Sequence, residues 1–361
     1  MKIAAGRTCY NGHEAEKKEA QMKRTAIVLV LLSVLSSMSF GITLVQKSET
    51  TPEFILSGHV WARYTLNYLA EKQMTNQMSI SRNYITMKLG GTDYNSNITL
   101  DIVNKAGAQT AGDFQVWIKT GYIEFTKLPF LVDVGIKFRA GIQSMYTGTN
   151  TTWKYNLYEV PVEGKAGLSS ADMGAALIGS ALDKMISYEL AVYSGDGYTK
   201  LDTDKLKALC ANVTVKVMDG LNVNMTYYKK AGVTGGNTEL NNLAVTEAVV
   251  SYTAWPLMDS YAAVIEAVGP KSAGKSGVKQ IVSLYAGVKP LDWLSVHARM
   301  DIENPDTEAV NDEINQYYAG VLIPIAEKAS LLLDYSLKQK RTQITGDKND
   351  NNFVAQIKWD W

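Results

Sequence analysis

Residues 351–361 read NNFVAQIKWDW, and this stretch decides how the rest of the chain is interpreted. Every second residue is apolar, and the apolar set shares one face: Phe353, Ala355, Ile357, Trp359 and Trp361. Alternation with a period of two indicates a strand and not a helix. A strand whose aromatic face met only water would fray and would invite aggregation. We therefore expect something other than water against that face.

The same alternation recurs along the chain. Residues 54–69, 133–143 and 293–302 read FILSGHVWARYTLNYL, DVGIKFRAGIQ and WLSVHARMDI, with aliphatic residues on one face and polar residues on the other. About sixteen such segments have the length typical of barrel strands. They are 54–69, 78–90, 96–105, 113–126, 130–142, 171–181, 185–195, 206–218, 221–230, 243–255, 260–269, 278–289, 292–302, 314–325, 328–339 and 352–361.

The connections between these segments alternate in length. GGTDYN, KLP, LDK, DG, PLMD, PLD and AEK are tight turns. Between them lie longer polar connections, including AEKQMTNQ at 70–77 and the stretch 143–170. In an up-and-down sheet this alternation places the short turns at one end and the long loops at the other. We therefore predict an all-β fold: a transmembrane antiparallel up-and-down β-barrel of about 16 strands.

Closure of this barrel explains the last strand. Its apolar face meets outer-membrane lipid, and its free edge pairs with the first strand, so no edge is open in hydrocarbon. Trp255, Trp293, Trp359 and Trp361 fall near one end, as an interfacial aromatic girdle would. The competing fold is a secreted β-sandwich or solenoid. About sixteen strands would make two sandwich domains, and no linker separates two halves.

The first 41 residues have a different character. Residues 22–41, MKRTAIVLVLLSVLSSMSFG, have a basic start, an apolar stretch and the small residues Ser39 and Gly41, which together predict a secretory signal peptide. A transmembrane anchor is the alternative, but the apolar stretch is about half of the roughly 20 residues that it needs. Residues 1–21 precede this leader, and we interpret them as the result of a start codon assigned too early. We expect 42–361 to form the barrel.

Composition excludes several classes of function. Without residues 1–41 the chain keeps 30 basic and 33 acidic residues, and this mild acidity argues against nucleic acid as a partner. Cys9 and Cys210 are the two cysteines, so 42–361 holds neither a disulfide framework nor a cysteine metal site. Ser295, His297 and Asp301 merely alternate along one strand, so we predict no enzyme. The two histidines of 42–361 are separated, so we predict no metal site. No cofactor is expected either.

Two segments resemble a known family. LSSADMGAALIGSALDKMISYELAVYSGDGY, at 168–198, is similar to a segment of bacterial outer-membrane porins related to the phosphate-selective O and P porins. IEFTKLPFLVDVGIKFRAGIQ, at 123–143, resembles the strand, Leu-Pro turn and strand of the same family. The resemblance runs loosely over 54–361 and implies a porin in the bacterial cell outer membrane, with a homotrimer as the expected assembly. The lysine-rich third loop that phosphate selectivity needs is missing.

The alternation of residues along the strands and the resemblance to the porin family together indicate the candidate site residues. Facing the pore we expect Arg63, Arg82, Lys88, Asp133, Lys137, Arg139, His297, Arg299 and Asp301. Such charges either set ion preference or simply wet the interior. The resemblance implies that the long loop 143–170 folds into the barrel and narrows it with Lys154, Glu159, Glu163 and Lys165; the alternative is a surface loop without pore contact. Trp359 and Trp361 are the candidates for membrane insertion and the girdle. Lys119 and Glu124 break the parity of their strand, which requires either a bulge or a different register from the one assigned here.

Function follows from strand number and loop length. About sixteen strands enclose a lumen wide enough for water. We therefore predict a porin: a water-filled channel through which small hydrophilic solutes or ions diffuse passively. Its role would include ion transport. The alternative is a structural or adhesive outer-membrane barrel without channel activity, which predicts long, Thr-rich or aromatic-rich outer loops. Arg139 and Arg299 are expected at one height, which predicts a slight preference for anions.

Overall fold

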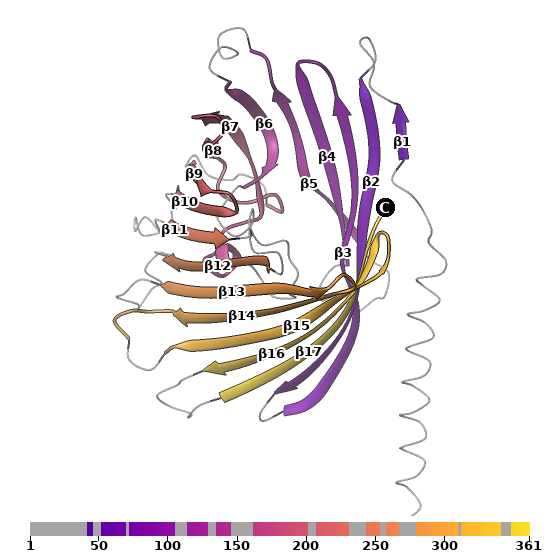
Figure 1. The fold of residues 1–361 in the computed structure, drawn as a ribbon, viewed down its shortest axis with the longest axis vertical. Helices are drawn as coiled ribbons and strands as arrows, with labels where there is room; N and C mark the ends of the chain where they lie inside the picture. Colours follow the sequence, from indigo (N-terminus) through magenta and orange to yellow (C-terminus); the bar gives the residue numbers. More distant parts are fainter. Residues whose placement is uncertain are drawn as a thin grey trace, which may run out of the picture. The chain divides into compact units, whose positions relative to one another are not determined.

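The fold is a closed antiparallel β-barrel in the computed structural model (Figure 1). The structure describes residues 42–45, 52–69, 72–104, 114–128, 135–145, 162–200, 207–230, 243–252, 258–266, 279–309, 312–340 and 348–361. The expected leader, 22–41, and the preceding 1–21 lie outside these residues, as does Trp255. No helix among the described residues is long and apolar enough to cross a membrane.

Within the described residues, seventeen strands make one sheet. They are β1 Ile42–Val45, β2 Glu53–Leu69, β3 Lys72–Gly90, β4 Tyr94–Asn104, β5 Phe114–Phe125, β6 Lys137–Ser144, β7 Ala171–Ala181, β8 Ile186–Tyr193, β9 Ala208–Met218, β10 Leu221–Lys230, β11 Leu243–Tyr252, β12 Met258–Glu266, β13 Gln280–Leu291, β14 Leu294–Asn304, β15 Ile314–Ala326, β16 Ala329–Lys340 and β17 Lys348–Asp360. A four-residue helix, α3 (Val162–Lys165), lies between β6 and β7. All the strands predicted from the sequence are present, and β1 is an additional one.

Pairing between β17 and β2 closes the ring. Their register runs from Asp350 opposite Leu69 to Asp360 opposite His59. Beyond it, Gly58 and Trp361 exchange two backbone hydrogen bonds of 2.9 and 2.8 Å. β1 pairs with the start of β2 at Phe54–Leu56, where β17 has already ended. Every strand from β2 to β17 therefore has a partner on each side, as a barrel in hydrocarbon requires.

Burial along the strands is inverted relative to a soluble protein. On β14, Ser295, His297 and Asp301 are buried, whereas Val296 and Ile302 are exposed. Elsewhere Met225 is 60% exposed, while its inward neighbour Asn224 is 2% exposed. A polar interior with an apolar exterior has no explanation in water, but it matches a barrel whose outer face meets lipid. The predicted transmembrane barrel is thus confirmed.

Two strand boundaries differ from the prediction. β3 begins at Lys72 and not near 78, because it continues its pairing with β2 up to Leu69 opposite Lys72. Most of the predicted loop AEKQMTNQ is therefore strand. β6 begins at Lys137 and not near 130, and residues 129–134 lie outside the described part of the chain. Polar residues at 72–77 hid the extension of β3, because backbone pairing in a long hairpin does not need an apolar face.

Two β-bulges change the parity of neighbouring strands. On β5, Thr99 of β4 opposes Thr120 but Leu100 opposes Ile118, so Lys119 is an extra residue. Of the two explanations for Lys119 and Glu124, the bulge is confirmed. On β3, Trp61 of β2 opposes Arg82 and Ala62 opposes Ile80, so Ser81 is also extra. A bulge places two consecutive side chains on one face of a strand, and here both bulges add side chains to the interior.

The closing contact can be tested at Gly58. A Cβ atom there would lie 2.3 Å from the Tyr84 carbonyl oxygen and 2.5 Å from the Trp361 ring. We expect Gly58→Ala to destabilise the barrel by about 1–3 kcal/mol, because backbone cannot yield to the methyl group. The measurement is the urea midpoint of heat-modifiable gel migration for refolded 42–361. Gly90→Ala is the control, since its Cβ would be 3.6 Å from the nearest atom. Equal midpoints for the two variants would contradict this closing geometry.

Candidate functional site

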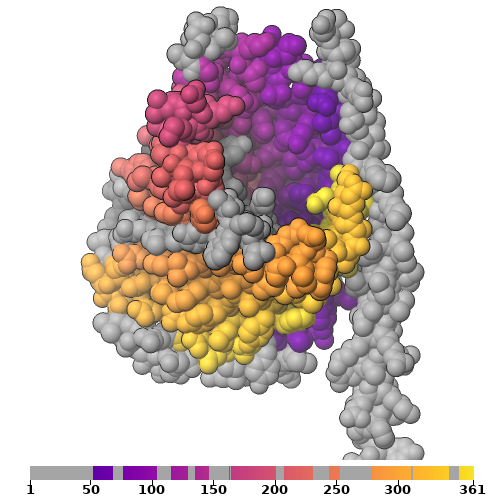
Figure 2. All heavy atoms as spheres, viewed as in Figure 1, coloured from indigo at the N-terminus to yellow at the C-terminus, as the bar shows by residue number. Residues whose placement is uncertain are grey.

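Charged and aromatic side chains gather inside the barrel. Figure 2 shows the molecule hollowed between the indigo-to-magenta and the red-to-orange strands. They form three groups on different parts of the wall. The aromatic–cation cluster consists of Trp61, Arg82, Tyr84, Lys119 and Lys358. The Glu124 cluster consists of Tyr122, Glu124, Lys137 and Arg139. The Asp301 cluster consists of Lys165, Ser283, Arg299, Asp301, Gln316 and Tyr318.

In the aromatic–cation cluster, several cations share two aromatic rings. The Arg82 guanidinium carbon lies 4.6 Å and the Lys358 Nζ 4.7 Å from the centre of the Trp61 ring. Lys119 Nζ donates to the Tyr84 hydroxyl at 2.6 Å, and Arg82 Nη1 donates to the same oxygen at 3.3 Å. Aromatic faces attract cations, but they do not cancel the repulsion between them. The arrangement therefore concentrates positive charge.

Both bulges contribute to this cluster. The extra residue on β3 places Ser81 and Arg82 consecutively on the inner face, and Ser81 Oγ donates to Gln356 Oε1 at 3.2 Å. The extra residue on β5 adds Lys119 beside the inward Thr120. Among the described residues, no carboxylate forms an ion pair with Lys119, whose polar partner is Tyr84. Regular alternation would have placed fewer cations on this wall.

The Glu124 cluster holds one carboxylate against two cations, and Glu189 of β8 adds a second carboxylate to this wall. Arg139 Nε donates to Glu124 Oε2 at 3.0 Å, and Lys137 Nζ lies 3.4 Å from Glu124 Oε1. The guanidinium also lies 4.7 Å from the centre of the Tyr122 ring. On β8, the Tyr193 hydroxyl donates to Glu189 at 2.8 Å. Acid and base are adjacent here, so this wall contributes little net field.

The Asp301 cluster joins the connection between β6 and β7 to the wall. Lys165 Nζ lies 2.7 Å from Asp301 Oδ2 and 3.2 Å from the Tyr318 hydroxyl, and it also contacts Gln316 Oε1. Arg299 binds the same carboxylate with bonds of 2.8 and 2.7 Å. Lys279 Nζ donates to the Lys165 carbonyl oxygen at 2.9 Å. The C-terminal end of α3 is therefore bound to β14 and β15 inside the barrel.

Apolar contacts hold the same segment. Val162 is fully buried against Val249, Ile281, Tyr285 and Tyr318 of β11, β13 and β15. Further along the segment, Ala166 and Leu168 pack with a second buried group that includes Tyr193 and Tyr228. Residues 162–168 thus cover the inner wall from β7 to β15. The opposite wall, around β2, β3, β5 and β17, carries the aromatic–cation cluster.

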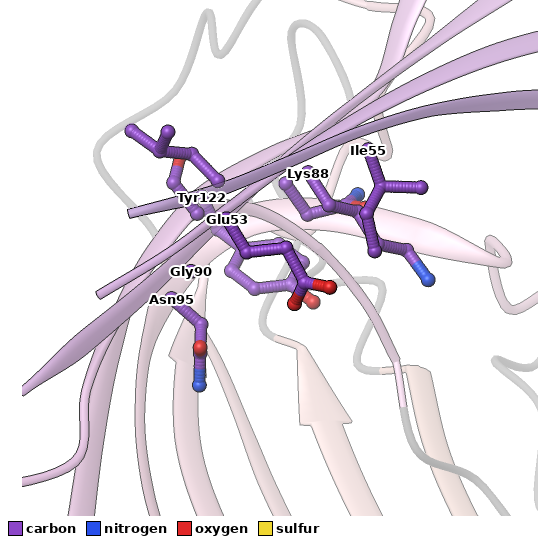
Figure 3. A pocket seen from close by; sticks show the side chains of 9 residues that line it. Glu53, Ile55, Lys88, Gly90, Asn95 and Tyr122 are labelled. Atoms are coloured by element: carbon purple, nitrogen blue, oxygen red, sulfur yellow. The ribbon is translucent and has the colours of Figure 1, made fainter. Parts of the chain in front are cut away.

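Two hollows lie near the short-turn end. The first, of about 230 Å³, is lined by Glu53, Ile55, Lys88, Asn95 and Tyr122 among others (Figure 3). The second, of about 380 Å³, lies beside Lys137, Arg139 and Glu189. Both are open hollows with charged and apolar side chains in their lining.

The structure places the predicted residues as follows. Arg63, on the inner face of β2, donates to Gln356 at 2.9 Å, and Lys88 lines the first hollow. Asp133, Lys154 and Glu159 lie outside the described residues, and of Glu163 only the backbone of α3 is described. Trp359 pairs with Val60 and Ala329, and the Trp361 ring lies over Gly58. Sequence reasoning missed Trp61, Tyr84 and Lys119 as a group, although the parity break at Lys119 was a usable signal.

The structure adds ion pairs to the predicted arginine pair. Arg139 contacts the Glu124 carboxylate, and Arg299 contacts the Asp301 carboxylate. Each carboxylate also binds a lysine, Lys137 or Lys165. That the two arginines lie at one height stays a prediction. A further group of cations lies around Trp61 and Tyr84.

Catalytic and metal-binding groupings were searched for as well. Asp301 is bound to Arg299, Lys165 and Ser283, while neither ring nitrogen of His297 has a hydrogen-bond partner among the described residues. Ser295, His297 and Asp301 therefore do not form a relay. In the described part of the chain, no group of three or more His, Cys, Asp or Glu side chains is arranged to hold a metal ion.

Comparison with known proteins supports the porin fold. No family model matches the chain, and no curated protein matches it. Among solved structures, the outer membrane channel DcaP of Acinetobacter baumannii is similar with a TM-score of 0.62 and 13% identity, over 88% of this chain and 99% of that one. An anion-selective porin from Comamonas acidovorans gives 0.62 and 9%, over 86% and 100%. The trimer form of OmpT of Vibrio cholerae gives 0.56 and 15%, over 86% and 100%.

The chain has the fold of bacterial outer-membrane porins. A barrel of this fold with an apolar outer face belongs in the bacterial outer membrane, as the sequence predicted. Membership of the phosphate-selective O and P family has no support from these comparisons, which agrees with the missing lysine-rich loop.

The anchor of the inner segment can be tested at Lys165. We expect Lys165→Met to lower the free energy of unfolding by about 1–3 kcal/mol, because it removes charge-assisted hydrogen bonds to Asp301. Freed from β14, the segment 162–168 should also raise the open-channel noise in single-channel recordings. Lys216→Met is the control, since Lys216 pairs with Asp219 at an exposed turn. Noise and urea midpoints equal to wild type would show that Lys165 does not fix the segment.

Proposed function

We propose that this protein is a porin that forms a water-filled channel for passive diffusion of small hydrophilic solutes or ions. The observation that carries the proposal is the polar, charged interior of a closed ring of this size. A lumen of about sixteen strands is wide enough for water, whereas about eight strands would be filled by side chains. No enzymatic role is part of the proposal.

The inner wall also supports a preference for anions. Arg82, Lys119 and Lys358 surround Trp61 and Tyr84 on one side, and the covered wall of β7–β15 lies on the other. In a narrowed, partly dehydrated passage, nearby charges weigh more than distant ones. The three cations of this cluster support a positive field on that side of the lumen.

Assembly and partners follow the same proposal. Outer-membrane lipid is the partner of the apolar outer face, and the girdle roles of Trp359 and Trp361 belong to it. Because one similar structure is the trimer form of OmpT, we include a homotrimer in the proposal. Cross-linking of the refolded barrel in detergent would measure the number of chains.

The channel itself is tested in planar bilayers. Refolded 42–361 should produce discrete conductance steps, because ions cross a wet lumen without a conformational change. Folding is established first by heat-modifiable gel migration. A folded protein without conductance steps would overturn the channel and favour the structural or adhesive alternative.

Ion preference is tested by reversal potential in a salt gradient. Replacing Arg82 and Lys119 together by Gln should move the reversal potential toward cation selectivity by several millivolts or more, because two cations leave the narrow section. Conductance should stay of the same order. Lys216→Gln at the exposed turn is the control. If the double variant and the control gave the same reversal potential, the cluster would not lie on the ion pathway.

A further inference from the structure

The segment that follows β8, residues 194–200, is attached to the strands beside it and is called the inner strap below. Three of its amides donate hydrogen bonds to the start of β7: Ser194 N to the Met173 carbonyl at 2.8 Å, Gly195 N to Asp172 Oδ2 at 2.7 Å, and Tyr198 N to the Ala171 carbonyl at 3.1 Å. The Ser194 hydroxyl also contacts Asp172 Oδ1. Asp172 is 1% exposed, and besides the inner strap its carboxylate accepts a hydrogen bond from the Met173 amide of β7 among the described contacts.

A lysine on the other side completes the attachment. Lys230, at the end of β10, donates from Nζ to the Gly195 carbonyl at 2.9 Å and pairs with Asp196 at 2.6 Å. The base of the inner strap is therefore fixed between β7 and β10. A connection held by so many polar contacts is a defined structural element and not a loose loop.

The far end of the inner strap reaches another part of the wall. The Tyr198 hydroxyl donates to Asp101 Oδ2 of β4 at 3.0 Å. β5 and β6 lie between β4 and β7 in the sheet, so the Tyr198 hydroxyl links the inner strap to a strand beyond both of them. Lys119 Nζ lies 5.8 Å from the centre of the Tyr198 ring. The inner strap thus ends against the aromatic–cation cluster.

The protonation state of Tyr198 favours its hydrogen bond to Asp101. Burial first, and then the neighbouring Asp101 carboxylate, raise the pKa of the Tyr198 phenol. The hydroxyl therefore stays protonated and can donate at any physiological pH. Asp101 is 4% exposed and faces inward, so the accepting group is shielded from bulk water. The bond is partly buried and charge-assisted, and charge-assisted bonds are stronger than neutral ones.

We propose that the inner strap is a second constriction of the pore, distinct from residues 162–168, and that Tyr198 limits the size of the anions that reach Lys119. Residues 162–168 cover the wall from β7 to β15, whereas Tyr198 lies over β4 to β7. The two elements therefore narrow the lumen from different sides. This inference rests on the proposed channel function and adds a size-selecting residue to it.

The test compares small and bulky anions. Tyr198→Ala should raise the ratio of glutamate to chloride conductance roughly twofold or more, because a ring beside the cationic cluster is removed and size exclusion relaxes. Tyr198→Phe keeps the ring and should leave the ratio near wild type while loosening the tether. Tyr335→Phe is the matched control, since it removes a tyrosine hydrogen bond, to Asn351, on the lipid-facing side.

Hydrogen exchange gives a second readout that does not need a current. Peptides covering 194–198 should exchange faster in Tyr198→Phe and in Asp101→Asn than in wild type or in Tyr335→Phe. An unchanged conductance ratio in Tyr198→Ala, with a conducting wild type, would overturn the size-selecting role. Unchanged exchange in Tyr198→Phe would overturn the tether. A wild-type barrel that is folded but passes no current would overturn the channel function instead, and the exchange result would still decide the tether.

Discussion

Hydrogen bonding of the backbone is the constraint on which the rest of this structure depends. In hydrocarbon, an unpaired strand edge has no water to satisfy it, so β17 must return to β2, and the pair of bonds between Gly58 and Trp361 completes the ring. Once the ring is closed, each strand has one face toward lipid and one toward the lumen. Alternation then places most polar side chains inside, while buried apolar groups pack where residues 162–168 cover the wall.

A closed ring leaves a cavity that the chain partly fills with its own connections. Residues 162–168 use buried apolar groups such as Val162 and a single cation, Lys165, to bind the wall at β11–β15. The inner strap is held mainly by hydrogen bonds to backbone groups and carboxylates. These bonds involve Asp172, Lys230 and Tyr198. Both segments are connections at the long-loop end, and both stabilise themselves by contacts with strands remote in sequence. The wall that they leave open is rich in cations.

Periodicity predicted most of the fold from the sequence. The strand positions, the short turns and the inward faces of β14 and β17 follow from alternation, because lipid on one side and water on the other impose a strict pattern. The pairing registers of the strands were harder to predict from the sequence. On β3, residues 72–77 are polar and were predicted as a loop, yet backbone pairing with β2 continues through them. The pairing of Arg139 with Glu124 could not be predicted either, since it depends on which strands are adjacent and on their offset. The parity break at Lys119 was visible, but its meaning required the neighbouring bulge at Ser81.

Regular alternation limits each strand to one inward side chain for about every 6.6–6.8 Å of its length. The bulge at Lys119 removes that limit at one point, because Lys119 and Thr120 both serve the interior while Ile118 and Ile123 stay on the outer face. The extra residue does not affect closure of the barrel, because the parts of β5 before and after it both stay paired with β4. A chain shortened by this one residue would keep the same lipid-facing surface and the same closure. The bulge is therefore a position where the electrostatics of the interior can change by insertion or deletion, with no demand on the membrane-facing half of the protein.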